Sequence, residues 1–367
     1  MKITVPRLVA LTASVAVLAA TGIGWTTAPV PASTQPATTV SIMSVPVPGV
    51  FQGVDFGTGH NGFPTVTELP DGRLRMMWRH GSGHASADGE ILTSVGDPSG
   101  ADWSEPERVI VDNGADIRDP HLGPSGLSTI DGEVFLTYFV TVNGVPSGAR
   151  VARSADGGET FGPSVRIDPG FPWAAISSPV IKVNGKLWTA FYAKPPGESI
   201  ESAYAAWSVN GGQSWSTVRI AIGMSGNPFQ EPWAVAGANN SVVFVMRDGS
   251  WRSLATRSID AAGAWAPLTR NVIANATGNS ASVRASNGRI YLVYRDTVSR
   301  AAKLASSEDN GVTWTVERVL MVKPAGAAVG SVGMTYAHPI ELGQGYLFCP
   351  VGMERGDGDS RLYLGFL

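Results

Sequence analysis

The feature that most constrains this sequence is a short motif that recurs at regular intervals. Residues 154–161, 208–215 and 307–314 all match Ser-x-[Asp/Asn]-x-Gly-x-[Ser/Thr]-[Trp/Phe]. Looser copies occupy residues 94–103 and 258–265, and the aromatic residues that end the five copies lie 49–58 residues apart. Such a period is typical of repeat folds in which each repeat is one supersecondary unit.

The residue types of the motif indicate a structural role. Its acidic or amide side chain can accept hydrogen bonds from the turn backbone, glycine supplies an unusual φ, and the aromatic ring packs between strands. A second signal runs in phase with the first, because dipeptides typical of hairpin turns separate apolar-rich, β-like runs. These dipeptides are Asp71-Gly72, Asp131-Gly132, Asn184-Gly185, Asn239-Asn240 and Asn287-Gly288.

The two signals together predict an all-β fold, a six-bladed β-propeller of four-stranded antiparallel blades. The 44 glycines and 25 prolines suit many short strands and turns. Residues 346–351 and 362–367 complete only part of a last blade, so we expect a strand from residues 47–56 to close the ring. Cys349 is the single cysteine, which excludes an intramolecular disulfide and leaves stability to packing.

The N-terminus predicts export. Lys2 and Arg7 precede an apolar run, so residues 1–25 are expected to form a signal peptide; an uncleaved membrane anchor is the alternative. Residues 26–45 are uncharged and rich in Thr, Pro and Ala, which predicts a linker. Residues 46–367 form the predicted propeller. The net charge of −3 and the absence of Lys/Arg runs argue against nucleic-acid binding.

One rim of the predicted propeller gathers charge. In blades whose strands alternate in direction, the starts of the innermost strands and the ends of the second strands ring the central channel. Several arginines there favour a ligand with a carboxylate, since a guanidinium binds a carboxylate in a bidentate fork. The alternative is internal ion pairing at solvated blade ends. The polar residues concerned include Arg79, Arg118, Asp119, His121, Glu231, Arg247, Arg295, Tyr336, His338 and Glu354.

With these repeats, residues 54–367 resemble the sialidase (neuraminidase) superfamily, whose propellers carry the same boxes. The resemblance implies an exo-glycosidase that releases a terminal acidic sugar. It also implies a tyrosine nucleophile assisted by a glutamate, three arginines that hold the substrate carboxylate, and an aspartate as acid/base. The segment from residue 230 to 247 is similar to a family strand and hairpin, which implies Glu231 as the tyrosine's partner and Arg247 as a carboxylate ligand. Residues 335–338 imply Tyr336 as the nucleophile.

The other family positions match less closely. Arg295 or Arg300 could supply the third arginine, and Arg295 is preferred because it ends its strand as Arg247 does. Gly62 stands where the first arginine belongs, so we expect Arg79, at the same rim, to replace it. His84 and Arg118 are further candidate substrate ligands.

The acid/base has three candidates. Asp88 lies nearest the family position, although it equally suits a turn residue ahead of Gly89. Asp119 begins the next inner strand, and His84 could also donate a proton.

No cofactor or metal is expected, because the histidines at positions 80, 84, 121 and 338 lack a metal-ligand spacing on one element. The expected partner is a glycan or glycoconjugate, and the mature chain is expected to be a monomer without a membrane span. Two other classes remain open. A polysaccharide lyase would neutralise a uronate with arginine and abstract a proton with His84 or Tyr336. A glycan-binding propeller without activity would account for the missing arginine.

Overall fold

The computed structural model describes residues 51–97, 99, 102–109, 111, 116–123, 133–249, 253–322, 334–342, 345–354 and 360–367. The predicted signal peptide, the linker and the Asp131-Gly132 turn lie outside these residues. The chain divides into two units, residues 1–42 and 43–367, and all described residues belong to the second. No helix in the described part has the length and apolar character needed to cross a membrane.

The described chain is all-β apart from a single 3₁₀ turn, η2 (Ala238–Asn240), and its strands follow one another as antiparallel meanders. The first meander comprises β2 (His60–Glu68), β3 (Leu74–Gly81), β4 (Glu90–Gly96) and β5 (Glu107–Val109). The second comprises β6 (Asp116–Gly123), β7 (Val134–Val142), β8 (Val145–Ser154) and β9 (Val165–Arg166). In the third, β10 (Trp173–Ile176) and β11 (Ile181–Val183) both pair with β12 (Lys186–Lys194), which is followed by β13 (Ser202–Ser208) and β14 (Ser216–Ala221).

The second half of the chain repeats this arrangement. The fourth meander comprises β15 (Phe229–Ala236), β16 (Val242–Asp248), β17 (Ser253–Ile259) and β18 (Thr269–Ala274). The fifth comprises β19 (Ala276–Arg284), β20 (Ile290–Asp296), β21 (Ala301–Ser307) and β22 (Thr315–Val322). In the last, β23 (Met334–Ala337) and β24 (Ile340–Glu341) pair with β25 (Leu347–Glu354), and β26 (Ser360–Phe366) follows.

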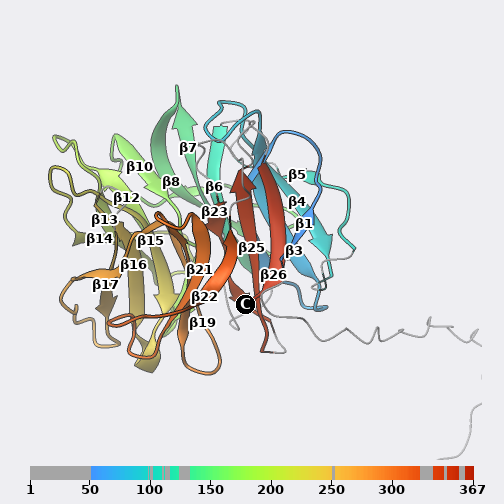
Figure 1. Ribbon diagram of the computed structural model, residues 1–367. Coiled ribbons are helices and arrows are strands. Elements are labelled where there is room, and N and C mark those ends of the chain that lie inside the picture. Colours follow the sequence, from blue (N-terminus) through green and yellow to red (C-terminus); the bar gives the residue numbers. More distant parts are fainter. Residues whose placement is uncertain are drawn as a thin grey trace, which may run out of the picture. The chain divides into compact units, whose positions relative to one another are not determined.

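The N-terminal strand expected within residues 47–56 is present as β1 (Phe51–Val54). It pairs antiparallel with β26, so strands from the two ends of the described chain lie in one sheet. Figure 1 shows β1, β3 and β4 in blue beside β25 and β26 in red. The ring of Phe56, just after β1, stacks on Trp78 of β3 with centroids 4.3 Å apart.

Adjacent meanders are joined in places, so the strands form two four-stranded and two nine-stranded sheets instead of separate four-stranded sheets. The joins are single parallel bridges, His60 to Ser360 and Ala174 to Ser147. Between meanders, side chains pack face to face. Trp188 of β12 meets Phe244 of β16 with ring centroids 6.4 Å apart, in a cluster of buried residues. Such strands carry near-continuous apolar runs because both faces are covered.

The repeated motif forms the turn predicted from its residue types. In the copy at residues 154–161, the Asp156 carboxylate accepts hydrogen bonds from the Thr160 backbone (2.9 Å) and the Ser154 hydroxyl (2.6 Å). Asn210 and Asp309 accept the equivalent backbone bonds at 3.0 and 2.8 Å. The motif glycine has a φ of 87° at Gly158, a conformation that few other residues adopt readily. These copies are therefore structural hairpins.

Candidate functional site

Four strands carry the same irregularity near the place where charge was predicted to gather. Each contains a β-bulge, seen as a register shift against its neighbour, and each bulge holds a non-glycine residue with positive φ. Bulges re-aim side chains, and strained backbone concentrates at functional sites. The residues are Phe63 in β2, Asp119 in β6, Glu231 in β15 and Tyr336 in β23, with φ of 56°, 46°, 48° and 52°.

The bulges bring Tyr336 and Glu231 into contact although they are 105 residues apart in sequence. The Tyr336 hydroxyl donates a hydrogen bond to Glu231 Oε1 at 2.8 Å. The second oxygen of the same carboxylate lies 3.1 Å from Nη1 of Arg247, and Arg247 also donates to Gln230. Glu231 and Arg247 are both buried, so this ion pair is protected from solvent. The phenyl ring of Phe63 lies 4.4 Å from the Tyr336 ring.

Electrostatics keep the Tyr336 phenol protonated. Burial raises its pKa well above the ordinary value, the negative charges of Glu231 and Asp119 raise it further, and Arg247 opposes them. The phenol can therefore act as a nucleophile only when a base removes its proton, and Glu231 is in contact with it. Arg295 of β20 lines a small cavity with Tyr336 and Gly278. Burial lowers the pKa of Arg295, while Tyr336 and Glu231 counteract that effect.

Asp119 is a buried carboxyl group beside this pair. Burial, followed by the charge of Glu231, raises its pKa to about 7, while a hydrogen bond from Ser177 at 2.8 Å has the opposite effect. A carboxyl group with such a pKa can both donate and accept a proton near neutral pH.

Asp88 lies in a different environment. It is exposed in the loop between β3 and β4 and accepts hydrogen bonds from the Ser82 backbone at 3.1 and 3.2 Å. Hydrogen bonds from Ser86 and Ser82 lower its pKa. These contacts are those of a residue that shapes its own loop.

Arg79 and Arg118, two expected substrate ligands, also bind this loop. Arg79 is completely buried and donates to the carbonyl oxygens of Gly83 (2.8 Å) and Ser86 (2.6 Å). Arg118 donates to the Ser86 carbonyl at 3.1 Å and pairs with Asp116 at 2.9 Å. Both guanidinium groups thus bind carbonyl oxygens of the loop between β3 and β4.

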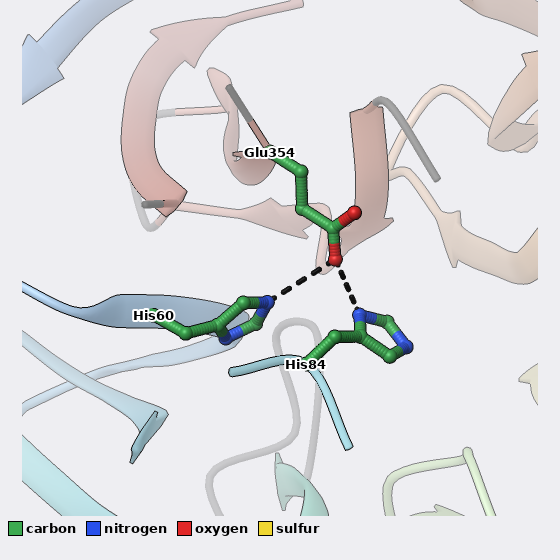
Figure 2. Close-up of side chains that lie close together, drawn as sticks. All are labelled: His60, His84 and Glu354. Carbon is green, nitrogen blue, oxygen red and sulfur yellow. Dashed lines mark hydrogen bonds and ion pairs between the residues drawn. The ribbon is translucent and has the colours of Figure 1, made fainter. Parts of the chain in front are cut away.

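A cluster of two histidines and one glutamate borders Phe63 and Tyr336. Glu354 Oε1 accepts hydrogen bonds from His60 Nε2 at 3.1 Å and from His84 Nδ1 (Figure 2). Burial alone would raise the pKa of Glu354, but the hydrogen bonds from the two imidazoles outweigh it and hold the pKa at about 2. The ring of His84 lies 5.0 Å from Phe63 and 6.4 Å from Tyr336.

At Gly62, where the family resemblance implies an arginine, the space beside the backbone is filled by His60. A Cβ atom added at Gly62 would overlap the imidazole of His60. His60 therefore takes the space into which a side chain at position 62 would extend.

Glu354 was expected at the charged rim, but its contact with His60 and His84 was not predicted, and neither His60 nor Phe63 was among the predicted site residues. A sequence signal for the bulge was available at Phe63, because proline follows it. The same pattern recurs at Asp119-Pro120 and Glu231-Pro232, where an acidic residue precedes proline. Proline suits a bulge because its missing N–H removes a bond that the bulge already breaks. The contact between His60 and Glu354 had no such signal, since 294 residues separate them.

Solved structures define the class of fold. A sialidase named Hadza microbial sialidase Hz136 matches with a TM-score of 0.64 and 16% identity, over 84% of this chain and 66% of that chain. The intramolecular trans-sialidase of Ruminococcus gnavus matches with a TM-score of 0.63 and 12% identity, over 84% and 94%. A protein of unknown function from Dyadobacter fermentans matches with a TM-score of 0.68 and 14% identity, over 88% and 100%. The fold is therefore sialidase-like.

The family follows from the sequence itself. A family model described as a BNR repeat-like domain matches residues 72–349, which is most of the chain. The chain belongs to this family. No curated protein gives a significant sequence match.

Proposed function

We propose that this protein is a secreted glycoside hydrolase of the sialidase type that releases a terminal acidic sugar from glycans. One observation carries the proposal, the 2.8 Å hydrogen bond from the Tyr336 hydroxyl to Glu231, which is backed by the buried ion pair to Arg247. A phenol that is hydrogen-bonded to a buried carboxylate is already in contact with the base that its activation requires. The sialidase-like fold supports the same class of reaction.

The proposed architecture is a six-bladed β-propeller spanning residues 46–367, with residues 1–25 as the export signal and 26–45 as a linker. The succession of antiparallel meanders supports it, each meander providing one blade. The pairing of β1 with β26 supports closure of the ring between the first and last blades. In this arrangement the bulged strands β2, β6, β15 and β23 are innermost, and their bulges face one channel.

In the proposed mechanism, Tyr336 oxygen attacks the anomeric carbon while Glu231 takes the phenol proton. The bond to the leaving group breaks as Asp119 gives its proton to the glycosidic oxygen. Water then attacks the tyrosyl–sugar bond, Asp119 accepts the water proton, and the phenol regains its own from Glu231. A neutral phenol suits this substrate because a carboxylate nucleophile would be repelled by the sugar carboxylate.

Substrate binding is assigned to Arg247 and Arg295. Arg247 is buried against Glu231, the partner of Tyr336, and Arg295 is half-buried in the cavity that Tyr336 also lines. Arg79 and Arg118 are proposed to position the loop of residues 82–89, in keeping with their hydrogen bonds to it. Asp88, which bonds within the same loop, has no chemical step in this mechanism.

The test is a screen of chromogenic sialosides and uronides with Tyr336→Phe and Glu231→Gln. On a substrate that the wild type cleaves, each variant should lose roughly 100-fold or more in kcat, because each removes one half of the nucleophilic pair. Tyr336→Phe should keep the wild-type melting temperature, whereas Glu231→Gln leaves the buried Arg247 without its carboxylate and should lower it. Tyr204→Phe is the matched control, since its hydroxyl also forms a hydrogen bond, to Arg219 at 2.8 Å, away from the site.

Three results would contradict the proposal. Near wild-type turnover by Tyr336→Phe would exclude the tyrosine nucleophile. An unsaturated sugar product that absorbs in the ultraviolet would indicate a lyase. Glycan affinity without turnover would indicate a binding propeller.

A further inference from the structure

Three potential metal ligands meet at the edge of the candidate site. His60 begins β2, His84 lies in the loop after β3, and Glu354 ends β25, so three separate elements supply them. His60 and Glu354 are 2% and 8% exposed, while His84 is partly open to solvent. Figure 2 shows both imidazoles turned toward the same carboxylate oxygen. The surrounding sheet therefore holds the donor atoms in place without an ion.

The donor set and its spacing suit a transition metal. His60 Nε2, His84 Nδ1 and a Glu354 oxygen all lie within 4.8 Å of one another, close enough to share one ion after a small side-chain movement. Two imidazole nitrogens with one carboxylate oxygen form the ligand set of many catalytic zinc sites, whereas calcium and magnesium prefer all-oxygen sites.

We propose that His60, His84 and Glu354 bind one divalent transition-metal ion of the zinc type. Three protein ligands leave a position of a four-coordinate ion for water or a substrate atom. The ion binds through His60 Nε2, His84 Nδ1 and a carboxylate oxygen of Glu354, in place of the two N–H···O hydrogen bonds that join these groups without metal.

The position of the cluster assigns the ion a role, and this step rests on the proposed function. The His84 ring lies beside Phe63 and Tyr336, and the His60 ring fills the space next to Gly62. The resemblance to sialidases implies a positively charged arginine at the position where this chain has Gly62. The ion supplies positive charge at this place, and its open position accepts a carboxylate oxygen of the acidic sugar.

The test of the site needs no substrate. The purified chain is treated with chelator, dialysed, and titrated with ZnCl₂ by calorimetry; bound metal is then counted by mass spectrometry. CoCl₂ serves as a spectroscopic probe, because cobalt(II) bound in a tetrahedral site absorbs in the visible range. The expected result is one zinc per chain and a visible cobalt spectrum.

Two ligand variants and two controls locate the ion. His84→Asn and Glu354→Gln should each weaken zinc affinity by more than about 100-fold, since even residues that only support a ligand contribute 10–100-fold. His80→Asn removes another half-buried imidazole, which bonds to Asn61 at 3.0 Å, and should leave affinity unchanged. Glu341→Gln, at a buried glutamate bonded to Ser286, is the control for the loss of a buried carboxylate.

The outcomes separate the metal site from the proposed function. Absence of zinc binding by the wild type, or binding that survives both His84→Asn and Glu354→Gln, would overturn the site, whatever the enzymatic activity. Because His84 lies in a loop, His84→Asn is expected to fold, and its melting curve in chelator checks this. If zinc binds at this site, it should lower the KM for the acidic substrate. An unchanged KM would refute the carboxylate-binding role of the ion but not the metal site itself.

Discussion

At the scale of residues, the site combines groups whose charges are set by their neighbours. Glu231 is paired with Arg247 and accepts a hydrogen bond from Tyr336, which places it to take the phenol proton. Asp119 is buried and close enough to feel the charge of Glu231, and these two effects raise its pKa to about 7 although His84 and Arg118 oppose them. Two carboxyl groups in one site thus have different surroundings, an arrangement typical of acid/base pairs.

The raised pKa of Asp119 predicts how stability depends on pH. Between about pH 4 and 7 the folded protein retains a proton at Asp119 that the unfolded chain releases, since the ordinary pKa is 3.8 and the folded pKa is about 7. Stability from this group is complete below pH 4 and is lost as the pH rises to 7. Asp119→Asn should therefore lose less stability than the wild type across this window, as measured by urea unfolding at pH 4, 5, 6 and 7.

Asp102→Asn, at an exposed aspartate, is the control and should follow the wild type. If Asp119→Asn also ran parallel to the wild type, Asp119 would be ionised in the folded protein at low pH and could not serve as the proton donor.

Some of the site residues could be predicted from the sequence and others could not. Tyr336, Glu231 and Arg247 were predicted from short motifs, and the structure brings them together, because neighbouring residues on a strand carry a local signature. The cluster at Glu354 was not predicted, because two of its members lie at opposite ends of the chain. The burial of Arg79 could not be predicted either, because the sequence of its own strand does not show that the following loop folds back over the guanidinium group.

At the scale of elements, the structural hairpins of the meanders lie apart from the bulges that carry candidate site residues. Each of these bulges lies near the start of the first strand of its meander, and each motif hairpin follows the end of a third strand. Antiparallel pairing therefore puts bulges and hairpins at opposite ends of the strands. The sequence predicted the hairpins well, since their hydrogen bonds join residues at most four positions apart. It did not predict the bulges, whose backbone strain depends on the neighbouring strand.

This separation predicts the effect of Asp156→Ala. The change removes the bonds from the Thr160 backbone (2.9 Å) and hydroxyl (2.5 Å) that close the hairpin. The free energy of unfolding should fall by about 1–2 kcal/mol, the usual cost of losing a capping side chain. In contrast, kcat and KM should not change, since the turn lies away from the bulges.

Chemical denaturation and steady-state kinetics on the same preparations check both parts. Glu159→Ala, in the same turn, keeps these bonds and loses only the ion pair of an exposed carboxylate with Arg75 (3.4 Å), so its effect should be smaller. A selective loss of kcat at normal stability in Asp156→Ala would show that the site lies at the hairpin edge.

At the scale of the whole molecule, the sheet that contains β1 connects the two ends of the described chain to the site. It includes β2 with Phe63, β23 with Tyr336 and β25 with Glu354. The sequence predicted this pairing from an incomplete last repeat, a constraint that acts on the whole fold. It did not predict the bridges that merge neighbouring meanders into nine-stranded sheets, because a single pair of residues leaves no pattern along the chain.

The closing strand gives the last prediction. A chain that begins at residue 57 lacks β1 and Phe56, so β26 loses a partner along four residues and Trp78 loses a ring stacked 4.3 Å away. Loss of a core aromatic side chain costs about 3 kcal/mol or more, so the half-buried Phe56 should contribute less than this, and the exposed edge of β26 adds a further loss. If the meanders form one closed ring, this loss lowers the single melting transition of the whole domain, and kcat falls because Tyr336 and Glu354 lie in the same sheet. The control is a chain that begins at residue 51, which keeps β1 and should melt with the full-length protein. Calorimetry on the two truncated chains decides the matter, since equal melting temperatures would mean that β1 is an accessory strand and that the ring closes without it.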